Sequence, residues 1–131
     1  MTQETIDAVK KLTEFKSEKL FGATMIRLLS RQQIPTVRFD HVTIAKGFEL
    51  QPHIHTDSET FIYILEGTAI ATLDDHQSRV SAGDTIYIAT GVSHGFSTPE
   101  QTISLLVVQS PPIYSEESQP NIHFDKITDI S

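Results

Sequence analysis

The chain has 131 residues, which suits one domain with a single hydrophobic core, and no repeat or linker divides it. Its formal net charge is −7 and it shows no cluster of Lys and Arg, which argues against nucleic acid as a partner because nucleic-acid binding needs basic side chains facing phosphates. The absence of cysteine excludes disulfides and thiolate ligands, so a bound metal would be held by nitrogen and oxygen atoms.

Residues 1–20 are expected to form a short N-terminal helix or arm. Helix-forming residues run from Glu4 to Lys11, and apolar Ile6, Val9 and Leu12 recur at three-residue steps. This segment lacks the apolar core of a secretory signal, and no stretch of the chain approaches the roughly twenty apolar residues of a membrane span. We therefore expect a soluble, cytoplasmic protein that has no membrane partner.

Residues 21–112 carry the pattern of an all-β domain. Short segments rich in β-branched and aromatic residues alternate with Gly, Pro, Asp or Ser. Seven such segments are ATMIRLL, TVRFDHVTIA, FELQPHIH, ETFIYILEG, TAIATLD, DTIYIAT and TISLLVVQ. Seven or more strands at this spacing indicate a sandwich or barrel. Hairpins are predicted at Glu66-Gly67 and from Asp74 to Ser78.

The C-terminal tail, residues 113–131, is expected to pack as an irregular arm or to extend toward a partner. Three of the six prolines lie between residue 110 and the C-terminus. A small antiparallel barrel has unpaired sheet edges, which two protomers can cover by pairing, so we predict a homodimer. Apolar residues of the arm and tail, Ile6, Val9, Ile113 and Tyr114, could cover the partner or cap their own barrel.

Three of the six histidines have the spacing of a metal site. His53 and His55 lie two residues apart on a predicted strand, where side chains at i and i+2 point to the same face. Glu59 follows His55 by four residues, and His94 follows a later glycine-punctuated turn. Three imidazoles and one carboxylate suit divalent Fe, Mn, Ni, Co, Cu or Zn, and the affinity order does not choose among them. An octahedral ion held in this way keeps two positions open for substrate or water.

The other three histidines lack such a pattern. His41 reads as a half-buried hydrogen-bonding residue, His76 belongs to the polar run DDHQ at a hairpin tip, and His123 belongs to the polar tail. We expect none of them to bind the metal.

Two segments resemble the two motifs of the cupin family: GFELQPHIHTDSETFIYILEG (Gly47 to Gly67) and GDTIYIATGVSHGFST (Gly83 to Thr98). The resemblance implies a small antiparallel β-barrel, also called a double-stranded β-helix or jelly roll, and implies His53, His55, Glu59 and His94 as metal ligands. In the second motif Ala89 replaces the usual proline and Thr98 the usual asparagine. Neither position is a metal ligand in the family.

The position of Glu59 departs from the family pattern. That pattern puts six residues between the acid and the closing glycine, whereas seven residues separate Glu59 from Gly67. Counting backward from Gly67 places Thr60, a poor metal ligand, where the acid should be. One extra residue in FIYILEG, accommodated as a β-bulge, would reconcile the counts; without it, strand alternation turns Glu59 away from the histidines. We favour Glu59 as a ligand, and a three-histidine site is the alternative.

Strand alternation near these ligands indicates which residues could line the pocket, and the wall is mostly apolar if Phe, Ile and Val face inward. Its candidate residues are Phe48 or Glu49, Gln51, Phe61 or Ile62, Tyr63 or Ile64, Ile86 or Tyr87, and Phe96. Such a wall suits an aromatic or otherwise apolar ligand with one or two oxygen atoms for the metal. Arg27 and Arg38 could pair with a substrate carboxylate if they faced inward, although the outer, solvated face is the commoner place for an arginine on a strand.

These observations favour a metal-dependent enzyme that acts on a small organic molecule. The reaction would be dioxygenase-like at Fe(II) or isomerase-like, with Glu59 ligating the ion or acting as a catalytic base. The alternative is a module that binds or senses a small ligand without chemistry, which the shifted acid favours. A third hypothesis is that the metal only stabilises the fold.

Overall fold

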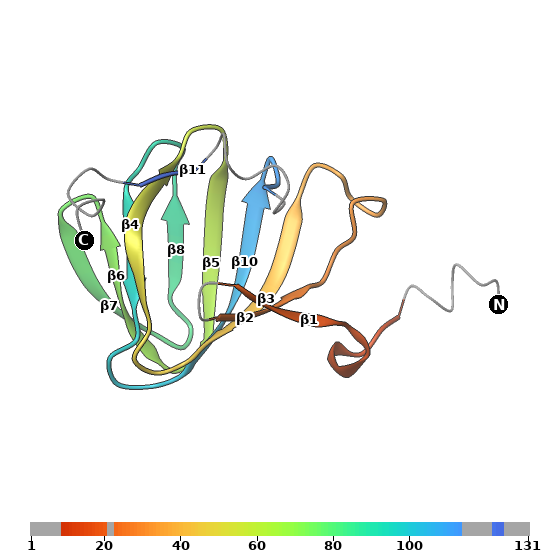
Figure 1. The fold of residues 1–131 in the computed structure, drawn as a ribbon, viewed down its shortest axis with the longest axis horizontal. Coiled ribbons are helices and arrows are strands. Elements are labelled where there is room, and N and C mark those ends of the chain that lie inside the picture. The colour runs from red at the N-terminus through yellow and green to blue at the C-terminus, as the bar shows by residue number, and fades with distance from the viewer. Residues whose placement is uncertain (1–8, 21–22, 114–121, 125–131) are drawn as a thin grey trace.

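All of the described strands lie in two antiparallel sheets. The structure is a computed structural model, and it describes residues 9–20, 23–113 and 122–124. One sheet has six strands in the order β1-β2-β3-β10-β5-β8, and the other has five in the order β11-β4-β9-β6-β7. The sheets curve around a shared interior, and the β1–β2 pair extends to one side (Figure 1). This arrangement confirms the predicted all-β barrel of the jelly-roll type.

The strands are short, from three to eight residues, and they include all seven predicted segments. No helix among the described residues is long and apolar enough to cross a membrane. In chain order the elements are the 3-10 turn η1 (Leu12–Glu14), β1 (Ser17–Leu20), β2 (Ala23–Arg27), β3 (Arg38–Ile44), β4 (Glu49–His55), β5 (Glu59–Glu66), β6 (Thr68–Leu73), β7 (His76–Ser81), β8 (Thr85–Ile88), β9 (His94–Ser97), β10 (Ile103–Ser110) and β11 (Ile122–Phe124).

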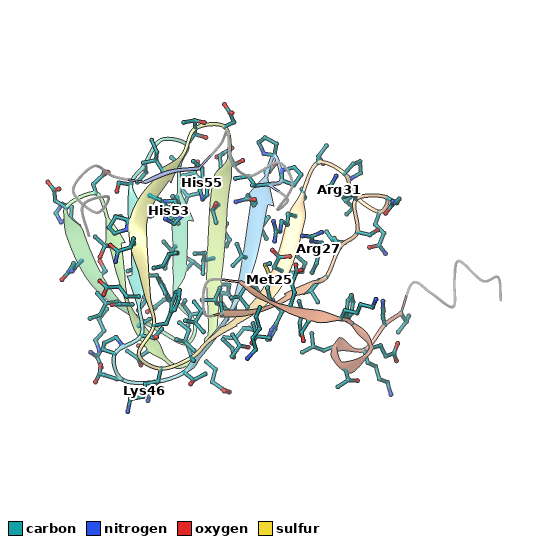
Figure 2. All side chains as sticks on the ribbon, viewed as in Figure 1. Met25, Arg27, Arg31, Lys46, His53 and His55 are labelled. Atoms are coloured by element: carbon teal, nitrogen blue, oxygen red, sulfur yellow. The ribbon has the colours of Figure 1, made fainter. Side chains whose placement is uncertain are left out.

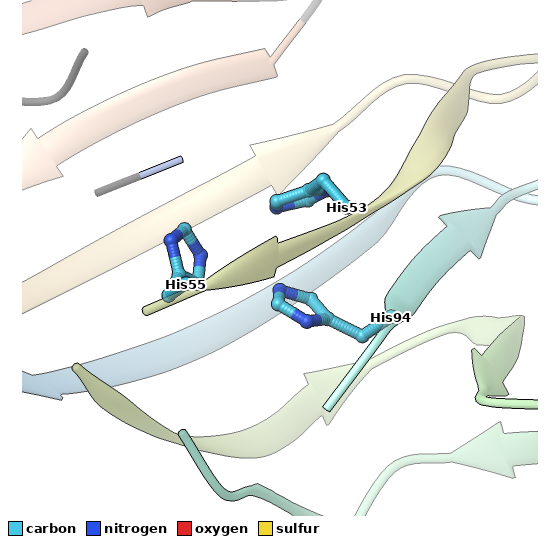
Figure 3. A group of neighbouring side chains, drawn as sticks. All are labelled: His53, His55 and His94. Carbon is cyan, nitrogen blue, oxygen red and sulfur yellow. The ribbon is translucent and has the colours of Figure 1, made fainter. Parts of the chain in front are cut away.

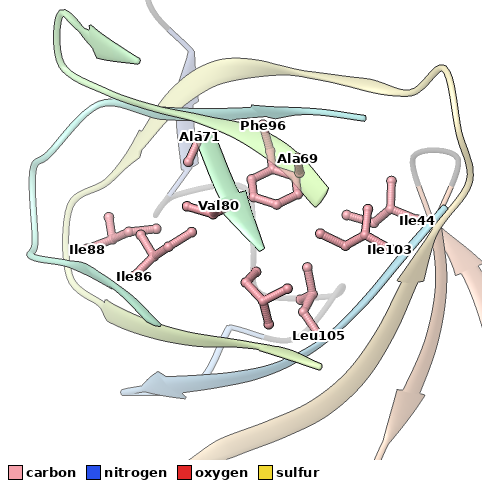
Figure 4. Packing of buried hydrophobic residues seen from close by; sticks show 10 residues of the cluster. Ile44, Ala69, Ala71, Val80, Ile86, Ile88, Phe96, Ile103 and Leu105 are labelled. Atoms are coloured by element: carbon pink, nitrogen blue, oxygen red, sulfur yellow. The ribbon is translucent and has the colours of Figure 1, made fainter. Parts of the chain in front are cut away.

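The apolar core lies between the two sheets (Figure 4). Alternate residues of each strand point inward because the side-chain period of a strand is two. Ile64 on β5 and Ile103 on β10 are completely buried. The other buried members of the cluster are Ile44, Ala69, Ala71, Val80, Ile86, Ile88, Phe96 and Leu105.

The chain crosses from one sheet to the other at Gly67, so the hairpin predicted at Glu66-Gly67 is wrong. Strand β5 pairs with β10 and β8, whereas β6 pairs with β7 and β9. Gly67 has φ +92°, and a Cβ there would lie 2.6 Å from the backbone oxygen of Thr102. Only glycine fits this corner. The second predicted hairpin is confirmed in a tighter form, because Leu73 already pairs with His76 across Asp74 and Asp75.

Both terminal segments contribute strands that the sequence did not predict. Residues 17–20 of the N-terminal arm form β1, which pairs with β2, and η1 is the one helical turn described in that arm. The tail returns as β11 along β4. Val9 is 83% exposed, while Ile113 is buried in its own chain and therefore caps its own barrel. Ile6 and Tyr114, and residues 4–8 of the expected helix, lie outside the described residues.

Candidate metal centre

Three imidazoles converge inside the barrel. His53 and His55 come from the end of β4 and His94 from the start of β9, and all three side chains are 7–8% exposed. Their candidate ligand atoms lie within 4.8 Å of one another, and their ring centroids are 4.2–5.0 Å apart (Figure 3). The structure therefore brings together the three histidines that the sequence singled out.

Backbone carbonyl groups orient two of these rings in the same way. The Nδ1 atom of His53 lies 2.9 Å from the carbonyl oxygen of Gln51, and that of His94 lies 3.0 Å from the carbonyl oxygen of Val92. A carbonyl oxygen only accepts, so Nδ1 carries the hydrogen in both rings and Nε2 keeps the lone pair that a metal needs. The two rings are thus held in the tautomer of a metal ligand.

The turns that deliver the histidines are fastened to each other. The amide of Gly91 donates to the carbonyl of His55, at 2.8 Å. Thr98, which stands in place of the usual asparagine, is fully buried; its hydroxyl donates to the carbonyl of Ala45 at 2.7 Å and accepts from the amide of Phe48 at 3.1 Å. The threonine therefore ties the end of β9 to the loop that leads into β4.

The structure places Glu59 on the outer face of β5, away from the histidines. The extra residue in β5 is present as a bulge, but it lies at Leu65, because Leu105 pairs with Ile64 and Ser104 with Glu66. No bulge lies between Glu59 and Ile64, so regular alternation holds there and Glu59 is on the outer face. Its carboxylate accepts a hydrogen bond from the Tyr87 hydroxyl, which raises the pKa of Tyr87. Glu59 is therefore not one of the residues that meet at the histidines.

Thr60 faces the interior in its place. Its side chain is 6% exposed and lines the same cavity as the three histidines. The Thr60 hydroxyl oxygen is buried and has no hydrogen-bond partner among the described residues. Beside it on β10, Gln109 also lines the cavity, and its side-chain oxygen accepts the amide hydrogen of Ile113 at 2.8 Å. Sequence reasoning missed Gln109, although alternation from the inward Leu105 and Val107 could have found it.

The histidines open into a cavity of about 230 Å³. Of the predicted wall residues, Phe48, Ile62, Ile86 and Phe96 line it. Ile64 is buried in the core without lining the cavity, and the other candidates, Glu49, Gln51, Phe61, Tyr63 and Tyr87, are exposed. Figure 2 shows His53 and His55 toward one end of the barrel and Lys46 at the other. The full lining is Ala23, Met25, Val42, Ile44, Phe48, Leu50, His53, His55, Thr60, Ile62, Ala71, Leu73, Ile86, Ile88, His94, Gly95, Phe96, Leu105, Val107 and Gln109.

Neither of the two arginines considered as carboxylate partners lines this cavity. Arg38 makes an ion pair with Asp40, with Nε 2.7 Å from Oδ2, and it also donates to the carbonyl of Ile113. Burial raises the pKa of Asp40 more than the neighbouring Arg38 lowers it. Ser58 donates to the carbonyl of Pro111 at 2.7 Å. Arg38 and Ser58 thus both hold the segment after β10, through the carbonyl groups of Ile113 and Pro111.

A barrel of two antiparallel sheets with a histidine cluster inside can be compared with known protein families. The model of the cupin domain matches residues 40–109, which is more than half of the chain, so the chain belongs to the cupin domain family. The uncharacterized protein MJ1618 of Methanocaldococcus jannaschii is 38% identical over 65 residues, which are 50% of this chain and 52% of that protein. The chain therefore spans about half the length of this relative.

Two solved structures share the fold over most of the chain. The polyketide cyclase RemF of Streptomyces resistomycificus is 25% identical with a TM-score of 0.75, covering 88% of this chain and 83% of that one. A predicted oxalate decarboxylase of Thermotoga maritima is 21% identical with a TM-score of 0.73, covering 79% of this chain and 99% of that one. At 21% identity, the likeness to the Thermotoga maritima protein shows a common fold and no more.

The donor set fits a divalent transition metal. Imidazole nitrogen suits Zn, Cu, Fe and Ni, and the carbonyl groups behind His53 and His94 are the outer partners that metal-binding histidines usually have. Three protein ligands leave coordination positions for other molecules, as catalytic sites do.

Proposed function

We propose that this protein is a metal-dependent enzyme that acts on a small, largely apolar organic molecule. His53, His55 and His94 would hold the ion, and an oxygen atom of the substrate would bind at an open position. One observation carries the proposal: the three imidazoles converge where a cavity lined mainly by apolar side chains becomes polar. The fold shared with the polyketide cyclase RemF supports an enzyme over a purely structural protein.

A dioxygenase-like reaction is our first choice. A bound ion can polarise a substrate oxygen or activate a small molecule in an open position. The described lining of the cavity contains no carboxylate, and Glu59, the candidate base, faces outward. A reaction that depends on the ion rather than on a side-chain base therefore suits the site best. An isomerase-like or cyclase-like reaction is the second choice, supported by the likeness to RemF.

A module that binds a small ligand without chemistry is the alternative function. The same lack of a carboxylate in the cavity lining favours it, because general acid–base catalysis would have to come from elsewhere. Turnover separates the two functions, since a binding module returns its ligand unchanged.

The first experiment measures metal content and turnover. Protein purified without a chelating tag, the His53→Ala variant and the matched control His76→Ala, whose imidazole is exposed on β7, are analysed by elemental mass spectrometry. We expect about one ion per chain in the wild type and control, and loss of the ion in His53→Ala. Fe(II)-loaded protein is then tested for oxygen uptake and product formation with aromatic and dicarbonyl compounds.

The outcomes separate the hypotheses. Absence of metal after reconstitution would overturn the metal-dependent proposal, and retained metal without turnover across the panel would favour the binding module. Melting curves before and after chelation test the purely structural role. Removal of an ion that is needed only for folding should strongly lower the melting temperature.

We further propose that the protein is a homodimer. Strand β8 forms one edge of the six-stranded sheet, and it carries Tyr87, which is 57% exposed and pairs across the strands with the exposed Phe61. Unpaired edges of this kind are commonly covered by a second chain. Light scattering at several concentrations should give twice the mass of the chain, and a constant monomer mass would contradict the proposal. The cytoplasmic location stays a prediction.

A further inference from the structure

We propose that the cavity selects a carboxylate with an apolar body of one or two rings, and that Thr60 donates a hydrogen bond to that carboxylate. This inference rests on the metal site proposed above and names the substrate class of the same site. It makes Thr60, which stands where the family pattern has an acidic residue, a specificity-determining residue.

The charge of the site favours an anionic ligand. Three neutral imidazoles leave the full double charge of a divalent ion uncompensated, whereas an additional carboxylate ligand would halve it. The described lining of the cavity includes no Asp, Glu, Lys or Arg. Charges attract one another much more strongly among apolar side chains than in water. A negatively charged ligand would therefore bind more tightly here than a neutral ligand of the same shape.

The Thr60 hydroxyl provides the second part of the argument. Its oxygen is buried and has no partner among the described residues, although most buried polar atoms of proteins are hydrogen-bonded. Thr60 lines the same cavity as the three histidines. A hydroxyl in this position can donate its hydrogen to an oxygen of a bound carboxylate, and the charge of that acceptor strengthens the bond.

Gln109 offers a second donor beside Thr60. The two residues are direct partners across β10 and β5, and both line the cavity. The side-chain oxygen of Gln109 accepts a hydrogen bond from the amide of Ile113. The Nε2 group of Gln109 is therefore the part of this side chain that can donate to a ligand. Arg38, the next residue across the sheet, is engaged by Asp40 and the Ile113 carbonyl. The nearby donors are thus neutral, and the metal supplies the positive charge.

The size of the cavity limits the apolar part of the ligand. An apolar cavity of about 150 Å³ holds one benzene molecule, and this cavity measures about 230 Å³. It is lined mainly by aliphatic and aromatic side chains, including Ile62, Ile86 and Phe96. A body of one or two rings fits this space, and a small dicarboxylate would leave the apolar wall without contacts.

The test compares two probes of equal shape and different charge, 2-naphthoate and 2-naphthamide. Binding to the Co(II)-loaded protein is measured by calorimetry and by the visible spectrum of the ion, and metal content is measured in every sample. We expect 2-naphthoate to bind at least about tenfold more tightly than 2-naphthamide and to change the spectrum. Thr60→Val should weaken 2-naphthoate binding at least about tenfold, which is the lower end of the effect of one hydrogen bond to a charged group.

Three further variants sharpen the result. Thr60→Ser keeps the hydroxyl and should bind 2-naphthoate nearly as tightly as the wild type, and Thr85→Val, on the exposed face of β8, should change nothing. Thr60→Glu should keep the metal and lose the preference for 2-naphthoate, since the site then carries its own carboxylate.

Each failure has its own signature. Equal binding of the two probes to metal-loaded wild type, or an unchanged affinity in Thr60→Val, would overturn the inference while the metal site stands. A wild type that takes up no Co(II) would overturn the proposed function itself, and the inference would fall with it.

Discussion

The two ends of the barrel interior use the same strands for different purposes. At one end, β4, β5, β9 and β10 present His53, Thr60, His94 and Gln109 to the cavity. At the other end, inward alternation presents apolar side chains that do not line the cavity, such as Ile64, Ala69 and Ile103. The two ends differ in register as well as in polarity, because the β4–β9 pairing shifts between Leu50 and His53, so the backbone pattern changes where the apolar interior gives way to the histidines.

The largest expected effect lies at the apolar end. Ile64 has no exposed surface, and Ile64→Ala would leave a cavity that its neighbours cannot fill. We expect the free energy of unfolding to fall by about 2–5 kcal/mol, measured by denaturant titration, with the metal affinity of the folded protein unchanged. Ile103→Val, which removes one methylene group, should cost only about 0.5–1.5 kcal/mol. A loss below about 1 kcal/mol in Ile64→Ala would contradict the view that this end carries the stability.

The opposite result is expected at the polar end. His94→Ala removes a proposed ligand, and changes to the outer partners of metal ligands already cost about 10–100-fold in metal affinity. We therefore expect the metal affinity to fall by more than about a hundredfold, measured by competition with a chelator. The stability of the metal-free protein should change much less than in Ile64→Ala. Comparable metal affinity in His94→Ala would exclude His94 as a ligand.

A smaller effect is expected beside the polar end, at Asp40. Burial raises the pKa of Asp40 above its ordinary value of 3.8, against the opposing effect of Arg38. The folded protein therefore keeps a proton that the unfolded chain has lost, so the contribution of Asp40 to stability falls as the pH rises through the interval from 3.8 to the raised pKa. Asp40→Asn cannot titrate. The stability of Asp40→Asn relative to wild type should rise with pH across this interval and then level off.

Unfolding titrations at closely spaced pH values test this sign. The same measurements on Asp75→Asn, at the exposed β6–β7 turn, provide the control. A relative stability of Asp40→Asn that is flat or falls with pH would show that Arg38 outweighs burial at this carboxyl group.

The sequence predicts much of this arrangement because alternation is a local signal. His53 and His55 share a face whatever the rest of the chain does, and the second motif places His94 near them. The corner at Gly67 was not predicted, because a turn between two strands looks the same in sequence whether they pair or enter different sheets. Strand β9 was missed since its four residues, His94 to Ser97, include a glycine and no β-branched residue.

The choice between Glu59 and Thr60 shows where sequence reasoning stops. Both the existence of a bulge in β5 and its effect on alternation could be stated in advance, but its position could not. A bulge before Ile64 would have turned Glu59 inward, and the bulge at Leu65 leaves Thr60 inside. The position depends on pairing with β10, about forty residues away in the chain, so tertiary contacts rather than local sequence decide which side chain meets the histidines.

The smallest expected effect tests this choice directly. Glu59 contacts Tyr87 on the outer face, away from the cavity, so Glu59→Gln should leave metal content and metal affinity unchanged, within about twofold. The hydrogen bond between the two side chains lies at the exposed surface, where such contacts change stability little. Chelator competition and denaturant unfolding of Glu59→Gln and Tyr87→Phe measure both quantities. A marked loss of metal affinity in Glu59→Gln alone would mean that β5 shifts its register when the metal binds, bringing Glu59 inside and Thr60 out.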